Sequence, residues 1–384
     1  MTAAAAACDG ASSATTDTGP PAADATPRGA PFVGIEVCAE CHADRAASFR
    51  ANAHYRTSAA ADRTSVHGSF DPPGNRLDTS GAALRFEMEE RDGRLWQTAI
   101  GAAAGGRTSR PFDISVGSGK LGQSYLYWLR GRLFQLPVSF VAEHARWVNS
   151  PGEMYRDGSA EFHRPIVPRC IECHTTWIEH VPGTFNEYVP GSEMYGVTCE
   201  RCHGPGGEHA AWHRAHPESR EPHAIVQPAE LPRDRSLDVC GQCHGGVGEP
   251  LRPAFSFRPG DVLAEFVAPP PPPKPGAEGL HSSNQLPRLR LSRCFEESGT
   301  LTCATCHDPH VHERGDTARF SKRCQGCHAP ADCGRADALG PEIADDCIDC
   351  HMPALDDAGT TMDLGGELLR PRIREHRIGI YAPR

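Results

Sequence analysis

The sequence predicts a mainly α-helical fold with much irregular structure, interrupted by one segment of β-hairpins. Three observations favour this class. The pattern Cys-x-x-Cys-His, which suits one helical turn, occurs seven times. The 384 residues include 39 Gly and 34 Pro, which interrupt regular elements. Only 39% of the residues are apolar and 7% aromatic, so something besides side chains must fill the interior.

The repeated pattern carries the most information. We number its copies motif 1 to motif 7 in chain order: CAECH at 38–42, CIECH at 170–174, CERCH at 199–203, CGQCH at 240–244, CATCH at 303–307, CQGCH at 324–328 and CIDCH at 347–351. With 17 Cys and 20 His in the chain, chance would supply roughly 0.04 copies. The repetition therefore reflects a shared chemistry.

Two chemistries use such ligands. Two thiolates and an imidazole satisfy three of the four positions that zinc prefers, but zinc modules do not need a histidine directly after every second cysteine. Covalent haem attachment does need it. Both thiols add to one porphyrin, and the next residue, one helical turn from the first cysteine, places its imidazole under the iron. We therefore predict seven covalently bound haem c groups, which also fill the interior.

The motifs specify the attachment sites residue by residue. The predicted thioether cysteines are Cys38, Cys41, Cys170, Cys173, Cys199, Cys202, Cys240, Cys243, Cys303, Cys306, Cys324, Cys327, Cys347 and Cys350. The predicted proximal iron ligands are His42, His174, His203, His244, His307, His328 and His351.

The first segment, residues 1–31, is predicted to be a disordered leader or tether. Haem attachment of this kind is completed outside the bacterial cytoplasm, yet the chain opens MTAAAAACDG without a proper signal peptide. Both facts agree if AAAAACDG ends a truncated lipoprotein signal, with Cys8 as the lipid anchor. The alternative is an alanine-rich leader with a stray cysteine. Because haem attachment is completed outside the cytoplasm, we expect a periplasmic or cell-envelope location. No stretch has the eighteen or so apolar residues of a membrane span.

The remaining segments follow from the motif positions and the breakers between them. Residues 68–168 contain no motif, and LRFEMEERDGRLWQTAIG and YLYWLRGRLFQLPVSF read as β-hairpins around DG and RG turns. The predicted division is 32–67 for the first haem unit, 68–168 for a haem-free β-rich segment, 169–244 for a three-haem unit, 245–292 for a proline-rich connector and 293–384 for a second three-haem unit with a tail.

Several stretches resemble a known family, the multihaem c-type cytochromes grouped with cytochrome c-554, which are similar in architecture to pentahaem nitrite reductases and octahaem hydroxylamine oxidoreductases. The resemblance rests on CAECH followed by NAHYRTSAA, LGQSYLYWLRGRLFQLPVSF before WVNSPG, TCERCHGPGGEH, SRCFEESGTLTCATCHDPH, DCIDCHMP and EHRI. It implies haems packed in near contact, mostly ligated by two histidines, that pass electrons outside the cytoplasm. It does not fix a reaction.

Histidines outside the motifs are candidates for the second axial position. His209 follows motif 3 by six residues, across a Gly-Pro-Gly-Gly turn. That segment is too short to wrap around its own porphyrin, so we expect His209 to ligate a different haem. The same argument applies to His54 after motif 1, and to His310 or His312 after motif 5. His376 lies in a tail with few apolar residues, where an iron bond would hold the chain, and Arg374 and Arg377 are expected near propionates.

Our distal candidates are therefore His54, His209, His310 and His376. Further candidates, for each of which an ordinary loop histidine is the alternative, are His144, His163, His180, His223 and His281; His67, His213, His216 and His312 rank below them. Met352 is interpreted as packing. Cys294 and Cys333 belong to no motif, and either a disulfide or two free thiols would suit an oxidising compartment.

Three classes of function remain. Electron transfer needs both axial positions filled, whereas substrate chemistry needs one open position. The surplus of histidines and the lack of a Cys-x-x-Cys-Lys motif favour an electron carrier over an oxidoreductase acting on a small nitrogen or sulfur compound, and thiolate-based metal storage is a third class. The net charge of −10 disfavours nucleic acid and suggests redox partner proteins, either other cytochromes or a membrane quinol-oxidising complex.

Overall fold

Strands and helices contribute almost equally to the fold. The computed structural model describes residues 31–80, 84–101, 106–152, 158–270, 279–357 and 359–381. It is 27% helical and 23% strand, with several antiparallel sheets, so the prediction of a mainly α fold is wrong. The motif-bearing helices are short and rarely propagate beyond the motif itself, whereas the segment between motifs 1 and 2 forms strands of up to eight residues. The leader with Cys8 and most of the proline-rich stretch lie outside the described residues.

Two sheets hold most of the strands. The larger has the strand order β1-β6-β7-β9-β10-β15-β16, with β8 paired to β7 and β11 paired to β8. The smaller has the order β2-β3-β4-β5. The strands of these sheets are β1 Ser58–Ala60, β2 Arg76–Asp78, β3 Leu84–Arg91, β4 Arg94–Gly101, β5 Arg107–Pro111, β6 Ile114–Val116, β7 Gly122–Leu129, β8 Arg132–Gln135, β9 Val138–Val141, β10 Arg146–Asn149, β11 Arg164–Pro165, β15 Met362–Leu364 and β16 Glu367–Leu369.

The two long hairpins turn at the dipeptides that the sequence singles out. β3 and β4 are joined by Asp92 and Gly93, and β7 and β8 by Arg130 and Gly131, all four with positive φ. This backbone conformation matches the right-handed twist of the flanking strands. The registers of these hairpins bring alternate residues of each strand to one face.

The main apolar core lies between the two sheets. Phe86 and Met88 of β3 are fully buried against Tyr125 and Tyr127 of β7 and their neighbours in one cluster. Within it the ring of Trp147 lies 5.8 Å from Tyr125, and its indole nitrogen donates to the carbonyl of Ser69 at 3.0 Å. The β-rich part thus has a side-chain core of its own.

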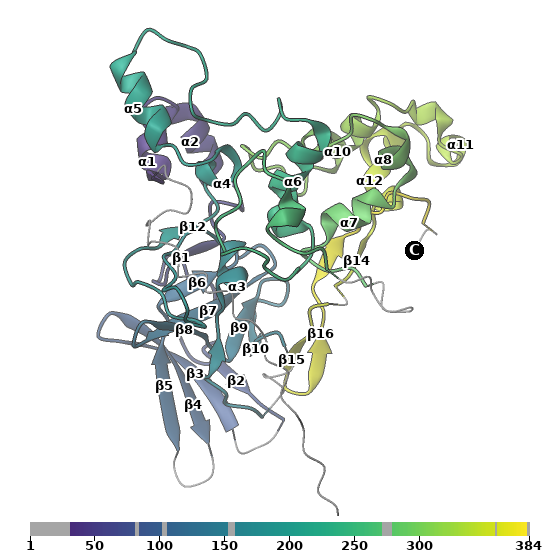
Figure 1. The fold of residues 1–384 in the computed structure, drawn as a ribbon. Helices are drawn as coiled ribbons and strands as arrows, with labels where there is room; N and C mark the ends of the chain where they lie inside the picture. Colours follow the sequence, from purple (N-terminus) through teal and green to yellow (C-terminus); the bar gives the residue numbers. More distant parts are fainter. Residues whose placement is uncertain are drawn as a thin grey trace, which may run out of the picture.

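The helices form the other part of the molecule, above the sheets in Figure 1. They are α1 Gly34–Ala39, α2 Ala43–Arg50, α3 Pro168–Glu172, α4 Cys199–His203, α5 Gly207–Ala215, α6 Arg233–His244, α7 Gln285–Arg290, α8 Arg293–Glu297, α9 Cys303–Cys306, α10 Thr317–Cys324, α11 Ala336–Leu339 and α12 Cys347–His351, with short 3-10 turns at Leu263–Glu265, Pro330–Asp332 and Pro341–Asp345. Each motif lies on or at the end of one of them. Within the described segments, no helix has the length and apolar character needed to cross a bilayer.

The C-terminal tail connects the two parts. Its hairpin β15–β16 joins the large sheet through β10, where Asn149 pairs with Asp363. Further along, β17 Arg372–Arg374 pairs with β14 Ala354–Asp356, directly after motif 7. A second small pair, β12 Thr175–Trp177 with β13 Met194–Tyr195, lies between motifs 2 and 3. Figure 1 shows the yellow tail running from the helices down to the sheets.

We expect Gly68→Ala to destabilise the β-rich part. Gly68 has φ +104°, and a Cβ there would lie 2.4 Å from the ring of Trp147. The backbone alone costs about 1 kcal/mol, and the collision adds roughly 1 to 3 kcal/mol. Gly93→Ala is the matched control, because Gly93 also has positive φ but has no atom within 4 Å. Urea unfolding followed by near-ultraviolet circular dichroism measures both, and equal losses would contradict the packing role of Gly68.

Candidate haem-binding site

Eight histidines meet in four pairs. The ring centres are 6.4 Å apart for His42 and His209, 6.1 Å for His244 and His54, 6.0 Å for His203 and His310, and 6.3 Å for His307 and His376. Each pair joins the histidine of one motif to a histidine that follows another motif. All four of our distal candidates are among them.

The spacing of these pairs suits an iron ion between the rings. Two imidazoles that bind one metal from opposite sides have ring centres about 6 Å apart, because each metal–nitrogen bond is about 2 Å and each centre lies about 1 Å beyond its nitrogen. Rings that stack directly come closer, as Trp212 and His223 do at 4.6 Å. The residues present therefore fit a haem with two axial imidazoles.

The second ring nitrogens support the same arrangement. Nδ1 of His203 lies 2.8 Å from the carbonyl of Val226, Nδ1 of His209 2.9 Å from that of His223, and Nδ1 of His376 3.0 Å from that of Arg374. A carbonyl only accepts, so each Nδ1 carries the proton and each Nε2 keeps its lone pair. Such contacts orient a ligating histidine and raise its basicity.

Three further ring nitrogens have oxygen partners. Nδ1 of His351 lies 2.8 Å from the carbonyl of Gly379, and Nδ1 of His244 lies 3.0 Å from the Gln285 side-chain oxygen. Nδ1 of His310 lies 3.3 Å from a carboxylate oxygen of Asp308.

Burial keeps several of these imidazoles neutral. Loss of solvent lowers the pKa of His54 and of His376 from 6.5 to about 4. It lowers the pKa of His174, in motif 2, to about 4 as well. A neutral ring is the form that binds iron, so these groups are ready to ligate at pH 7.

Asn52 positions two ligand-bearing segments at once. Its side-chain oxygen accepts from the backbone N–H of His54 at 3.0 Å. Its side-chain nitrogen donates to the carbonyls of Pro309 and Val311, on either side of His310. The segments that carry His54 and His310 are therefore joined through one buried amide, which our reading of the sequence did not identify.

Glu200, at the first variable position of motif 3, fastens the helix of motif 1. Its carboxylate accepts from the backbone N–H groups of Val33, Gly34 and Gly206, each at 2.8 Å. Charge-assisted bonds of this kind are stronger than neutral ones. They bring α1 and α4 together at the start of α1, next to the turn that leads to His209.

The tail that carries His376 is held by buried polar contacts. The carboxylate of Glu375, 2% exposed, receives two N–H groups of Arg288 on α7, one of them at 3.0 Å. Ser292 accepts from the N–H of Ile378 at 2.8 Å and donates to the carbonyl of His376. Arg374 contacts the carboxylate of Asp349 in motif 7. A Glu beside a His is too common a sequence pattern to have indicated this.

Attachment cysteines of different motifs also meet. Cys38 lies beside Cys199, Cys173 beside Cys243 and Cys240 beside Cys303. At longer range Cys202 interacts with Cys240, Cys306 with Cys324, and Cys324 with Cys347. Every motif is thereby connected to at least one other.

The remaining histidines are not paired in this way within the described residues. His174, His328 and His351 have no recorded ring contact there. His144, His163 and His312 are exposed. His180 packs on Tyr188, His67 on Phe140, and His213, His216 and His223 around Trp212, while His281 bonds to Ser283.

Cys294 and Cys333, which belong to no motif, form no disulfide within the described residues. Across the described ranges, no group of three or more His, Cys, Asp or Glu side chains is arranged to hold a metal ion.

Glu313 joins motif 5 to the helix of motif 6, and its contacts make the stability of the fold depend on pH. Hydrogen bonds from Arg323 hold its pKa at about 2, below the ordinary 4.5. A depressed pKa stabilises the folded state above pH 4.5, and this contribution is lost as pH falls from 4.5 towards 2. We expect Glu313→Gln to cost about 1 to 3 kcal/mol at pH 7 and to flatten the decline below pH 4.5. Thermal melts of both proteins, followed by Soret circular dichroism between pH 7 and 3, test this, and parallel pH profiles would contradict it.

The chain is similar to known cytochromes, over part of its sequence in one case and over most of its fold in another. Residues 143–204, which include motifs 2 and 3, match the family model described as cytochrome c554 and c-prime. The crystal structure of the outer cell wall cytochrome OcwA is similar over 90% of this chain and 79% of that chain, with a TM-score of 0.55 and 16% sequence identity. None of the curated proteins matches. The structural likeness concerns the fold, the family match covers two motifs, and together they support a c-type cytochrome, a class that carries covalently bound haem c.

Proposed function

We propose that this protein is an extracytoplasmic electron carrier that holds seven haem c groups, most of them between two histidines. The four imidazole pairs, spaced for one iron each, carry the proposal. We assign His209 to the haem of motif 1, His310 to that of motif 3, His54 to that of motif 4 and His376 to that of motif 5. Bound haem supplies reversible one-electron chemistry, and two protein ligands per iron keep substrates away from the metal.

The sulfur contacts imply an order for the seven motifs. Motif 1 meets motif 3, motif 3 meets motif 4, and motifs 4, 5, 6 and 7 follow one another. Motif 2 meets motif 4 from the side. Haems attached at neighbouring motifs would lie near one another. The order 1-3-4-5-6-7, with motif 2 as a branch at motif 4, is therefore the proposed path for electrons.

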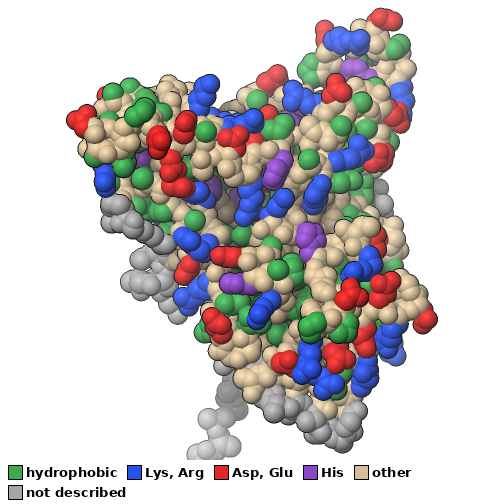
Figure 2. All heavy atoms as spheres, turned by 180° about the vertical axis from the view of Figure 1, so that it is seen from behind, with side chains coloured by type: hydrophobic (Ala, Val, Ile, Leu, Met, Phe, Trp, Pro, Cys, Tyr) green, Lys and Arg blue, Asp and Glu red, His purple; other side chains and the backbone are tan. Residues whose placement is uncertain are grey.

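Exposed attachment sites lie at both ends of this order. Cys41 in motif 1 and Cys350 in motif 7 are exposed, as are Cys170 in the branch and Cys327 in motif 6. These are the places where redox partners would exchange electrons. Figure 2 shows acidic and basic side chains interspersed over the face it presents, with imidazoles among them. We propose other cytochromes or a membrane quinol-oxidising complex as partners, and a cell-envelope location with Cys8 as the lipid attachment point.

A second candidate function is favoured by motif 2. The Nδ1 atom of His174 is buried without a hydrogen-bond partner in the described segments, and this histidine belongs to none of the four imidazole pairs. A haem there with one open position would act on a small nitrogen or sulfur compound. The branch position of motif 2 suits a site that exchanges electrons with the main order.

The proposed function predicts the haem content of the chain and the spin state of its iron. Denatured protein should retain seven c-type haems per chain through acid-acetone extraction, because each is held by two thioethers. The iron should be largely low-spin, since two imidazoles fill its axial positions. Pyridine haemochrome and electron paramagnetic resonance spectra measure both. Fewer than six haems would refute the proposal, and a large high-spin signal perturbed by nitrite, hydroxylamine or cyanide would favour the second candidate function.

His376→Ala should open one iron. The variant should convert one haem of the seven from low-spin to high-spin, bind one additional carbon monoxide, and recover the low-spin signal when free imidazole is added. Its tail should also be cleaved faster by protease, because the iron bond no longer holds it. His144→Ala, which changes an exposed histidine, is the control. Spectra identical to those of the parent in both oxidation states would remove His376 from the ligand set.

A further inference from the structure

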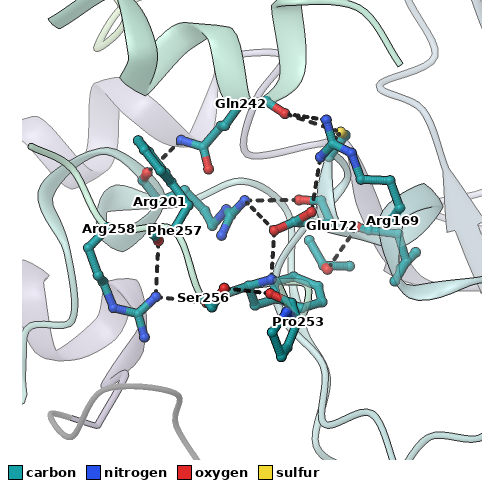
Figure 3. A network of polar contacts seen from close by, with 12 residues as sticks. Arg169, Glu172, Arg201, Gln242, Pro253, Ser256, Phe257 and Arg258 are labelled. Atoms are coloured by element: carbon teal, nitrogen blue, oxygen red, sulfur yellow. Dashed lines mark hydrogen bonds and ion pairs between the residues drawn. The ribbon is translucent and has the colours of Figure 1, made fainter. Parts of the chain in front are cut away.

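Motifs 2, 3 and 4 meet at a buried polar cluster. Arg169 and Glu172 come from α3, Arg201 from α4 and Gln242 from α6, and these four side chains are between 3% and 9% exposed. Three of them, Glu172, Arg201 and Gln242, occupy the second variable position of their motifs. Figure 3 shows the four side chains pointing toward one another between the helices.

Hydrogen bonds fix this cluster in one arrangement. Arg169 donates to the Glu172 carboxylate and to the Gln242 carbonyl, both at 2.9 Å. Arg201 donates to the backbone carbonyl of Glu172 at 3.3 Å and lies 3.9 Å from its carboxylate. The carboxylate also accepts from the N–H of Phe255 at 2.6 Å. Gln242 in turn donates to the carbonyl of Arg201 at 3.1 Å.

The cluster carries an excess of positive charge. Two guanidinium groups share one carboxylate, which leaves a net charge of one. The Nε atoms of Arg169 and Arg201 are buried and have no hydrogen-bond partner in the part of the chain that the structure describes. A charge buried away from solvent acts over a longer range than one at the surface, because it is screened less.

Its charge lies beside the attachment sulfurs of three motifs. Arg169 donates to Sγ of Cys173 at 3.6 Å, and that sulfur contacts Cys243. Arg201 directly precedes Cys202 in motif 3, and Gln242 directly precedes Cys243 in motif 4. Groups attached at motifs 2, 3 and 4 are therefore all within reach of the cluster.

We infer that the Arg169–Glu172–Arg201 cluster raises the reduction potentials of the haems at the junction of motifs 2, 3 and 4 by its net positive charge. The inference rests on the proposed function, and these residues act on the haems through their charge without contacting the iron. A haem gains one negative charge on reduction, so a nearby cation stabilises the reduced form and a nearby anion opposes it.

Three substitutions separate charge from structure. Arg201→Gln removes a positive charge and should lower the potentials of the junction haems. Glu172→Gln removes the negative charge, keeps the shape of the side chain, and should raise them. Arg201→Lys keeps the charge and should leave them near the parent values. We expect about a tenfold change in the reduction equilibrium for each charge removed, or about 59 mV for a one-electron couple.

Spectroelectrochemical titration of the full haem-loaded chain measures these shifts as a displacement of part of the titration curve. Arg107→Gln, which breaks an exposed pair with Glu89 on the small sheet, is the control and should shift nothing. Downward shifts in both Arg201→Gln and Glu172→Gln, or equal shifts in Arg201→Gln and Arg201→Lys, would overturn the inference, since both outcomes indicate structural damage. Unmoved potentials in variants that hold seven low-spin haems would overturn the inference alone, whereas protein without covalent haem would overturn the proposed function.

Discussion

The approach of two imidazoles from distant segments to about 6 Å is the constraint on which the helical part depends. Apolar side chains are scarce there, and most of the motif-bearing helices are one or two turns long. Polar contacts beside the histidines hold the segments in register: Asn52 for His54 and His310, Gln285 for His244, and Glu375 with Arg288 for His376. Each contact fixes a histidine ring or the backbone next to it, which orients a ligand with the accuracy that a metal site requires.

Different kinds of contact hold the two parts of the molecule together. The sheets enclose aromatic rings such as Tyr125 and Trp147, and the alternation of strand residues decides which side faces the core. The helices instead meet through charged and amide groups at the motifs themselves. Glu172, Arg201 and Gln242 are buried, whereas Glu40 of motif 1 and Asp349 of motif 7 are exposed. The variable residues of a motif are therefore buried or exposed according to whether the motif lies inside the group of helices or at its edge.

The sequence predicted the hairpins better than the overall class, and the four distal candidates that it singled out each lie next to the histidine of another motif. Asp92–Gly93 and Arg130–Gly131 are local signals, and the short distance from His209 to motif 3 is a limit that no folding can change. The predicted fold class was wrong because the helical signal of each motif covers only about five residues and does not extend to the rest of the chain. Short strands such as Arg372–Arg374 have too few residues to show the alternation that would predict them. Which histidine meets which motif depends on contacts across the fold, and a list of residues does not contain them.

The pairing of β15 with β10 has a consequence for biosynthesis. A strand made near the end of translation supplies the neighbour of a strand made more than two hundred residues earlier, so the large sheet stays open at that edge until nearly the whole chain has been synthesised. Non-local pairing of this kind is slow to form. The last hairpin therefore closes this edge of the large sheet only after all seven motifs have been synthesised.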